Sequence, residues 1–196
     1  NVVFSDLHPP GGDKRSEILS GLQKKQKSID PKYFYDARGS RLFEKITTLP
    51  EYYPTRTERQ ILKQDANAMA ELCGENCVLI EPGSGSSEKV RLLLDALKPA
   101  AYVPMDISSD FLKHSAIQLA EEYSWLHVHA VCTDFAKQEK EPEGIEQGKR
   151  VIFYPGSTLG NMKPDDATEF LSKLGHWVGQ DGGVLIGIDM HKSTRI

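Results

Sequence analysis

The stretch that decides the fold is Cys77-Val-Leu-Ile-Glu-Pro-Gly-Ser-Gly-Ser-Ser-Glu-Lys89. Its apolar run, Val78–Ile80, is typical of a strand that is buried on both faces of a parallel sheet. Glu81 places a carboxylate at the end of that strand, and a turn with two glycines follows. The pattern then predicts a helix over Ser87–Leu97, which one of the serines can cap. The stretch therefore predicts a strand, a bare turn and a helix in succession.

The turn leaves the main chain open to a ligand, because Gly83 and Gly85 carry no side chain that would hold the ligand away. Its sequence lacks the third glycine of the dinucleotide-binding fingerprint and the lysine-hydroxyl ending of a P-loop. A nucleotide-like ligand without a pyrophosphate fits better, and S-adenosylmethionine (SAM) is such a ligand. Taken alone, the turn is equally compatible with a tight connection whose glycines serve only backbone geometry.

Composition sets the class of protein. The chain has 196 residues, 39% hydrophobic and 27% charged, which is typical of a soluble globular protein with one good core. The net charge of −4 argues against nucleic acid as a partner, and no apolar run approaches the ~20 residues of a membrane span. Three cysteines without metal-binding spacing indicate buried thiols in a reducing compartment. We therefore expect a cytoplasmic protein that binds a small molecule, with no membrane, nucleic-acid or metal partner.

Residues 1–75 predict an N-terminal cap made of helices and aromatic side chains. The first helix is expected to begin at Asp13 or Ser16 and to run through Leu22. Four tyrosines gather in the loops of this segment, where an apolar face with a polar tip suits a ligand pocket. They are Tyr33, Tyr35, Tyr52 and Tyr53. Packing onto the core is the expected role of most of them, with one or two exceptions.

Two further helices are expected in the cap. Arg41–Leu49 is predicted to be a short helix that turns its apolar side chains inward. These side chains are Leu42, Phe43, Ile46 and Leu49. Thr57–Leu72 has apolar residues at helical spacing, and Thr57 is expected to cap this amphipathic helix.

Residues 76–196 alternate between strand and helix patterns and form the predicted ligand-binding core. The expected strands are Val78–Glu81, Ala101–Met105, His127–Val131, Val151–Tyr154 and Gly183–Asp189. The expected helices are Ser87–Leu97, Asp110–Glu122 and Asp165–Val178. Alternation at this spacing implies a parallel sheet with right-handed crossovers. The predicted fold class is therefore α/β, with a Rossmann-like core that has helices on both faces of its sheet.

Ligand-like side chains follow successive strands of this core. Asp106 lies roughly twenty residues past the glycines, where an acidic residue can hold a ribose diol, although it is equally placed to cap a helix. Asp134 can accept a hydrogen bond from an adenine amine, and Phe135 can cover the ring. The fourth strand runs into Pro155–Asn161, another glycine-bearing loop that ends in a short amide. Because ligands bind outside the carboxyl ends of parallel strands, these ends together predict one adenosyl pocket.

Six segments carry a resemblance to a known family. They are Pro31–Ser40, Leu49–Glu58, Glu81–Lys89, Pro104–Asp106, Pro155–Asn161 and Leu185–Lys192. Together they resemble the histidine-specific SAM-dependent methyltransferases of ergothioneine biosynthesis, which trimethylate the α-amino group of L-histidine to hercynine. The resemblance covers most of residues 30–192, and the segments Tyr52–Arg56 and Gly156–Asn161 are not general methyltransferase motifs.

The resemblance implies roles for seven residues. The implied SAM contacts are Gly83, Lys89, Asp106, Asp134 and Phe135. Tyr52 and Asn161 are implied to bind the histidine substrate, Asn161 through the amino-acid head group. Two departures from the family pattern stand beside these matches: Pro82 replaces a leucine, and Ser193 replaces an acidic residue. Neither departure removes an implied contact.

Methyl transfer from a sulfonium is an in-line displacement whose leaving group departs neutral, so we expect no metal and no catalytic side chain. Catalysis should come from holding a neutral amine about 3–3.5 Å from the methyl carbon. Asn161 can orient an amine without raising its pKa as a carboxylate would. The ring face of Tyr52 would tolerate the growing cation.

The family continues well past Ile196 with a substrate-binding region, so we expect the core to be truncated at its C-terminus. That region would set substrate selectivity, which leaves open a methyltransferase of the same fold with another amine substrate. An NAD-dependent oxidoreductase and a non-catalytic domain that kept the nucleotide pocket are the further alternatives.

Overall fold

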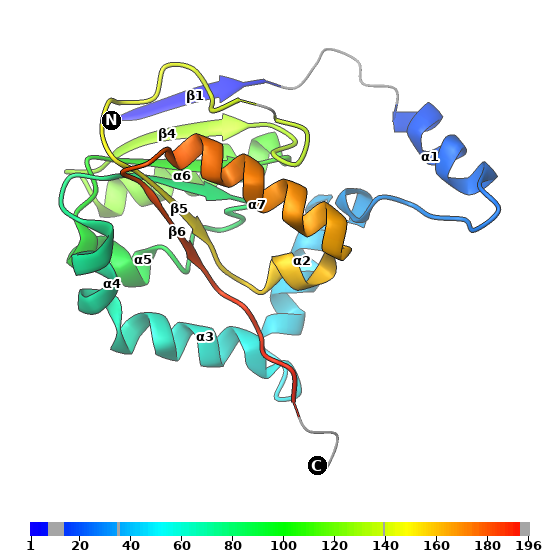
Figure 1. Ribbon diagram of the computed structural model, residues 1–196, viewed down its shortest axis with the longest axis horizontal. Coiled ribbons are helices and arrows are strands. Elements are labelled where there is room, and N and C mark those ends of the chain that lie inside the picture. Colours follow the sequence, from blue (N-terminus) through cyan, green and yellow to red (C-terminus); the bar gives the residue numbers. More distant parts are fainter. Residues whose placement is uncertain (8–13, 35, 139, 193–196) are drawn as a thin grey trace.

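The computed structural model describes residues 1–7, 14–34, 36–138 and 140–192, and its centre is a six-stranded parallel sheet (Figure 1). The strands are β1 (Val2–Asp6), β2 (Val78–Pro82), β3 (Ala101–Asp106), β4 (His127–Cys132), β5 (Arg150–Tyr154) and β6 (Gly183–Ile186). Their order across the sheet is β1-β4-β3-β2-β5-β6. Every neighbouring pair is parallel, so the carboxyl ends of all six strands lie at one edge of the sheet.

Seven α-helices and two 3-10 helices accompany the sheet within the described residues. They are α1 (Lys14–Gln23), η1 (Pro31–Phe34), α2 (Ala37–Thr47), α3 (Tyr53–Gln64), α4 (Ala66–Cys73), α5 (Arg91–Leu97), α6 (Ser109–Glu122), η2 (Thr158–Asn161) and α7 (Pro164–Val178). None of the described helices has both the length and the apolar character that a bilayer span requires.

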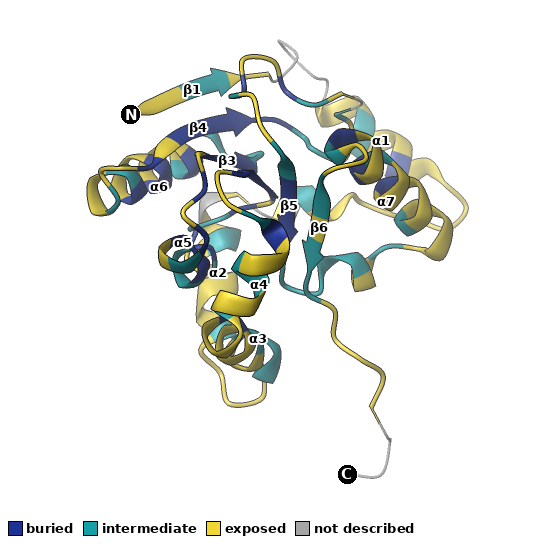
Figure 2. Ribbon diagram, turned by 60° about the vertical axis from the view of Figure 1, so that its left-hand side comes forward, coloured by how far each residue is buried: buried dark blue, intermediate teal, exposed yellow. Residues whose placement is uncertain are grey.

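Helices cover both faces of the sheet, as predicted. On one face Leu79 of β2 packs in a cluster with Leu93 of α5 and Leu119 of α6. On the other face Ile80 packs in a second cluster with Trp177 of α7. Figure 2 shows the central strands buried between these layers. The alternation of side chains along β2 therefore serves two cores, which explains why its sequence is apolar throughout.

The expected strands and helices of the core all occur, with shifted ends. Strand β6 ends at Ile186, and the backbone continues to Asp189 without strand pairing. Helix α5 begins at Arg91 and not at Ser87, because Ser87 has a φ of +54° that a right-handed helix does not accommodate. The turn after β2 is therefore longer than the sequence predicted.

Strand β1 is absent from the sequence prediction, which assigned all of residues 1–75 to the cap. Val2–Asp6 pairs in parallel with β4 at the edge of the sheet. The hydroxyl of Ser5 lies 2.9 Å from His129 Nε2, so a side-chain contact supports this pairing. The strand has only five residues, mostly exposed, and its own pattern is too short to identify it; the pairing with β4 decides it.

The cap helices differ from expectation at their boundaries. The predicted helix through Leu22 is confirmed as α1, whereas the expected start at Asp13 lies outside the described residues. Helix α2 begins earlier than predicted, because Asp36 caps it by accepting hydrogen bonds from the main-chain N–H groups of Arg38 and Gly39. The predicted single helix Thr57–Leu72 is instead two helices.

The break between α3 and α4 lies at Asp65, which ends one helix and begins the next. Helix α3 begins at Tyr53, with Pro54 in its first turn, so the predicted capping role of Thr57 is wrong. The early proline supplies the helical φ before Thr57 is reached.

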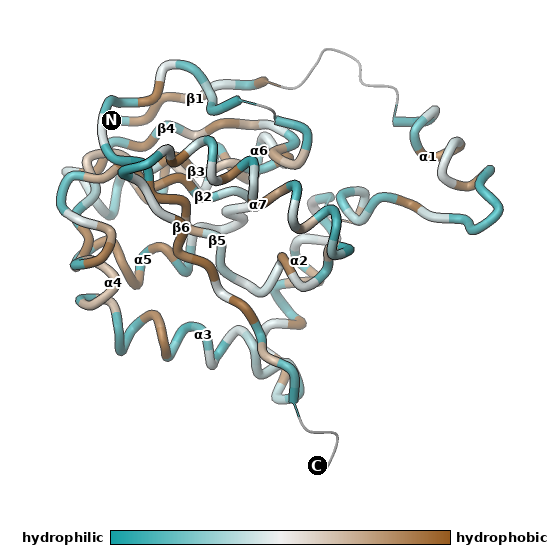
Figure 3. Tube along the Cα trace, in the orientation of Figure 1, coloured by the Kyte–Doolittle hydropathy of each residue, from teal (hydrophilic) through white to brown (hydrophobic). Residues whose placement is uncertain are grey.

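The apolar side of α2 is exposed, and the prediction that it faces inward is wrong for the chain described here. Its apolar side chains are 40–50% exposed: Leu42, Phe43 and Ile46, with Leu49 just beyond the helix. Figure 3 shows the hydrophobic segments concentrated in the strands and the helices packed on them, while α1 is largely hydrophilic. The core thus lies around the sheet, and the cap adds to it through α3 and α4, with Leu62 and Cys73 buried in the cluster on one face.

Candidate cofactor and substrate site

The seven residues singled out in the sequence all line one cavity of about 2040 Å³ beyond the carboxyl ends of the strands. They are Tyr52, Gly83, Lys89, Asp106, Asp134, Phe135 and Asn161. Their sequence positions span more than half of the chain, and the parallel sheet brings them together because it aligns the strand ends. The fold therefore supplies the common cavity that the proposed roles require.

The glycine turn is fixed to the neighbouring strand. The N–H groups of Gly83 and Ser84 donate to the carbonyl of Met105 in β3, at 2.7 and 3.1 Å. Gly83 has a φ of +73°, which disfavours an L side chain. A Cβ at this position would also stand 3.4 Å from the Phe135 ring, in the space between the ring and the turn. The turn is therefore shaped before any ligand enters, and its bare face looks toward an aromatic ring.

Asp106 is held in place by two main-chain N–H groups, and it does not cap α6, whose N-cap residue is Ser108. One carboxylate oxygen accepts a hydrogen bond from the Gly85 N–H at 3.1 Å, and the other accepts from the Ser108 N–H at 3.0 Å, next to the start of α6. Burial raises the pKa of Asp106, and these main-chain donors oppose the rise. The carboxylate is thus held between the glycine turn and α6 while it lines the cavity.

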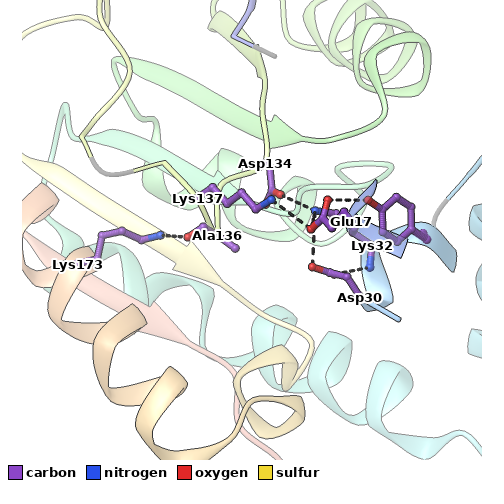
Figure 4. Close-up of polar contacts among 8 residues, drawn as sticks. Glu17, Asp30, Lys32, Asp134, Ala136, Lys137 and Lys173 are labelled. Atoms are coloured by element: carbon purple, nitrogen blue, oxygen red, sulfur yellow. Dashed lines mark hydrogen bonds and ion pairs between the residues drawn. The ribbon is translucent and has the colours of Figure 1, made fainter. Parts of the chain in front are cut away.

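Asp134 lies in a network of charges that reaches the cap (Figure 4). Lys32 Nζ of η1 is 3.4 Å from an Asp134 oxygen and 2.7 Å from a Glu17 oxygen of α1. Lys137 also forms an ion pair with Glu17, at 3.2 Å, and the Tyr33 hydroxyl donates a hydrogen bond to Glu17. The hydrogen bond from Lys32, with those from Tyr33 and Lys137, lowers the pKa of Glu17 to about 2. The network attaches η1 and α1 to the loop that follows β4.

Phe135 is held by the helix on the other side of that loop. Lys173 of α7 donates hydrogen bonds to the carbonyls of Phe135 and Ala136, at 2.8 and 2.9 Å. The Phe135 ring packs against Tyr154 and Phe170, with centroids 6.4 and 6.1 Å apart. Desolvation lowers the pKa of Lys173. The position of the ring therefore depends on α7, which the sequence did not connect to the site.

Glu81 is a fully buried carboxyl group at the base of the cavity. The Tyr102 hydroxyl donates to it at 2.5 Å and lies 3.1 Å from the Ser87 hydroxyl. Burial raises the pKa of Glu81 to about 8, against the opposing effect of the Tyr102 hydrogen bond. Glu81 is therefore largely protonated near neutral pH, so this carboxyl group itself adds little negative charge to the cavity.

Lys89 forms a short ion pair with a residue that the sequence did not single out. Its Nζ is 2.6 Å from Glu58 Oε2, and the Gly156 N–H donates to Glu58 Oε1 at 2.7 Å. Glu58 is the last residue of the family-like segment Leu49–Glu58. Its place in that segment was the only feature of the sequence that could have pointed to it as a site residue. The contact joins α3 to two of the turns that line the cavity.

The two proposed substrate residues come from different elements. Tyr52 immediately precedes α3, and its ring packs edge-on against Phe43 with centroids 6.2 Å apart. Asn161 ends η2 and lines the cavity with an exposed side chain. The loop before η2 is held by a hydrogen bond from the Ser157 N–H to the Gly187 carbonyl.

The remaining tyrosines of the cap have separate places. Tyr53 lines the cavity beside Tyr52, and its hydroxyl donates to Asp189 at 2.5 Å. Tyr33 binds Glu17 in the network described above, and Tyr35 lies outside the described residues. The three cysteines are buried thiols, as expected.

The chain is similar in sequence to methyltransferases of one known family. A sequence model described as "Histidine-specific methyltransferase, SAM-dependent" matches residues 14–196. Histidine N-alpha-methyltransferase of Mycobacterium tuberculosis is 42% identical over 185 residues, which are 92% of this chain and 56% of that protein. The 4-dimethylallyltryptophan N-methyltransferase easF of Epichloe festucae var. lolii is 31% identical over 190 residues, 89% of this chain and 55% of that protein. The chain thus spans about half the length of these relatives.

Solved structures show the fold. The magnesium protoporphyrin IX methyltransferase of Synechocystis PCC 6803, solved with bound SAM, aligns with a TM-score of 0.55 at 14% identity. The alignment covers 77% of this chain and 73% of that one. At this identity the likeness concerns the fold alone, and it confirms the predicted Rossmann-like core of class I methyltransferases.

Proposed function

Because the chain belongs to the family of histidine-specific, SAM-dependent methyltransferases, we propose that it transfers methyl groups from SAM to the α-amino group of L-histidine and produces hercynine. The observation that carries the proposal is the single cavity lined by all seven residues that match the family. A chance resemblance of scattered segments would not place these side chains around one space.

The residues around the glycine turn fit SAM. The bare face of Gly83 opposite Phe135 leaves room that a Cβ would fill, which is what a ligand bound close to the main chain requires. We propose that Asp106 holds the ribose, that Asp134 and Phe135 hold the adenine, and that Gly83 and Lys89 hold the amino-acid end. SAM would supply an electrophilic methyl group on a sulfonium.

The protein's own contribution is placement and charge. Tyr52 and Asn161 are proposed to orient the substrate so that its amine approaches in line with the breaking bond. The amine has to be neutral, and negative charge nearby would raise its pKa. Burial keeps Glu81 largely protonated near neutral pH, and Glu58 is paired with Lys89. These two features support a site in which the free amine is accessible without a catalytic base.

We also propose that residues 1–75 act mainly as a cap and residues 76–196 as the cofactor-binding core, with Val2–Asp6 as an exception because it lies in the sheet. The position of Tyr52 at the cavity supports a substrate role for the cap. A cytoplasmic location is supported by the three buried thiols, which fit a reducing compartment.

A related function is N-methylation of a different amino acid, because the relative from Epichloe festucae is named for a prenylated tryptophan substrate. Incubation of the purified protein with SAM and either L-histidine or 4-dimethylallyltryptophan, read by mass spectrometry, separates the two. Successive methyl additions to histidine alone are expected. Methylation of 4-dimethylallyltryptophan in preference to histidine would replace the proposed substrate.

Cofactor use is tested separately by calorimetry with S-adenosylhomocysteine (SAH) and by thermal shift with NADH. We expect SAH to bind and to raise the melting temperature, since a ligand that binds only the folded state stabilises it. Stabilisation by NADH and not by SAH would refute the methyltransferase proposal.

A further inference from the structure

Glu58 stands where three separate parts of the site meet. It belongs to α3, six residues after Tyr52, and its side chain is only 16% exposed. One oxygen accepts the Gly156 N–H at 2.7 Å, and the other pairs with Lys89 Nζ at 2.6 Å. The carboxylate also lies against Gly187, where a Cβ would overlap Glu58 Oε1. A single side chain therefore contacts the segments that follow β2, β5 and β6.

These contacts join the two halves of the cavity. Lys89 follows the glycine turn on the proposed cofactor side, whereas Gly156 begins the loop that leads to Asn161 on the proposed substrate side. Lysine carries its charge on a flexible four-carbon chain and does not hold one geometry without a partner. Glu58 restricts Lys89 and, through the same carboxylate, fixes the start of the Asn161 loop.

We propose that Glu58 is a positioning residue that sets the cofactor-side Lys89 and the substrate-side loop in register. The inference rests on the proposed function and deepens it. In-line transfer depends on the alignment of two bound molecules, and a misplacement of about 1 Å can reduce the rate about a hundredfold. One oxygen of Glu58 accepts a hydrogen bond and the other forms an ion pair, so the proposed role is to position Lys89 and the loop and not to act as a base.

Two substitutions separate the two contacts. Glu58→Gln keeps a carbonyl oxygen for the Gly156 N–H but removes the charge that restrains Lys89. Gly187→Ala keeps the charge but pushes the carboxylate away from Gly156, because the added Cβ overlaps Glu58 Oε1, while it stands only 3.3 Å from Pro155 Cα. We expect E58Q to weaken SAH binding about tenfold, with a smaller change in the KM for histidine. We expect G187A to lower kcat and raise the histidine KM with a smaller change in SAH affinity.

A double-mutant cycle identifies the pathway of the effect. If Glu58 acts on SAH through Lys89, then E58Q combined with Lys89→Met binds SAH no more weakly than Lys89→Met alone. The matched control is Asp95→Asn, which removes a carboxylate from the exposed Asp95–Lys98 ion pair at the end of α5, away from the cavity lining, where the atoms are 3.1 Å apart. This control should leave SAH affinity and both kinetic constants unchanged.

The possible outcomes distinguish the two proposals. Failure of the wild-type protein to bind SAH overturns the proposed function itself. SAH binding by the wild type with unchanged affinity in E58Q overturns only the role of Glu58. Additive losses in the double mutant also overturn it, because they show that Glu58 does not act through Lys89. A split between SAH affinity in E58Q and kcat in G187A supports it, since a general loss of stability would change both variants alike.

Discussion

Replacing the buried carboxyl group of Glu81 by an amide should change how the stability of the protein depends on pH. Burial raises the pKa of Glu81 from 4.5 to about 8 in the folded protein. Between these two values the folded protein holds a proton that the unfolded chain releases. The stability that Glu81 contributes is therefore full below about pH 4.5 and is lost as the pH rises through about 8. Glu81→Gln cannot titrate and removes this dependence.

The size of the effect follows from the width of the window. Each pH unit inside the window changes the free energy of unfolding by about 1.4 kcal/mol. Between about pH 5.5 and about pH 7.5, the contribution of Glu81 to the unfolding free energy of the wild type should therefore fall by up to about 3 kcal/mol. For a chain of this size that corresponds to roughly 6–12 °C in melting temperature. The difference in unfolding free energy between E81Q and wild type should shift in favour of the variant by that amount.

The assay is urea unfolding of both proteins at the two pH values, with melting curves as a second measurement. Glu122→Gln is the control. The hydrogen bond from Arg91 lowers the pKa of Glu122, so any stability that it contributes is lost only on the acid side of the window. An E81Q difference that is the same at both pH values would refute the reasoning, because Glu81 would then be ionised in the folded protein as it is in water.

Three further predictions concern the cavity. Gly83→Ala should cost about 1–2 kcal/mol of stability because of its positive φ, and should weaken SAH binding; an unchanged melting temperature and SAH affinity would contradict this. Lys173→Met removes the hydrogen bond to the Phe135 carbonyl. Because a hydrogen bond from a charged donor contributes about 1.5–3 kcal/mol, calorimetry should show SAH affinity reduced about tenfold. Equal affinity would show that the loop keeps its shape without Lys173. Asn161→Ala should raise the histidine KM about tenfold and leave SAH binding unchanged; a loss confined to SAH would place Asn161 on the cofactor side.

The exposed apolar side of α2 shows where local pattern fails. The spacing of Leu42, Phe43 and Ile46 correctly predicts a helix, because an amphipathic period depends only on neighbours three and four residues apart. Whether that side is covered depends on what packs against it, and in the described chain these side chains remain 40–50% exposed. Pattern therefore gives the element but not its burial.

The sequence alone determined the succession of strands and helices along the core, residues 76–196. The apolar run before Gly83, and the short polar residues Asp106 and Asp134 after later strands, are local features that the folded protein retains. Their meeting around one cavity could be inferred because parallel strands with helical crossovers align their carboxyl ends. The strand-end positions of Gly83, Asp106 and Asp134 were thus predictable from pattern and topology, whereas Tyr52 and Lys89 were assigned only through the family resemblance.

Only the tertiary structure decided the features that depend on distant pairs. Strand β1 exists as an edge strand because it pairs with β4, where Ser5 meets His129 from 124 residues away. The protonated state of Glu81 follows from complete burial, and the role of Glu58 from a contact with Gly156, 98 residues along the chain. Burial and long-range pairing are properties of the packed molecule, so no window of neighbouring residues encodes them.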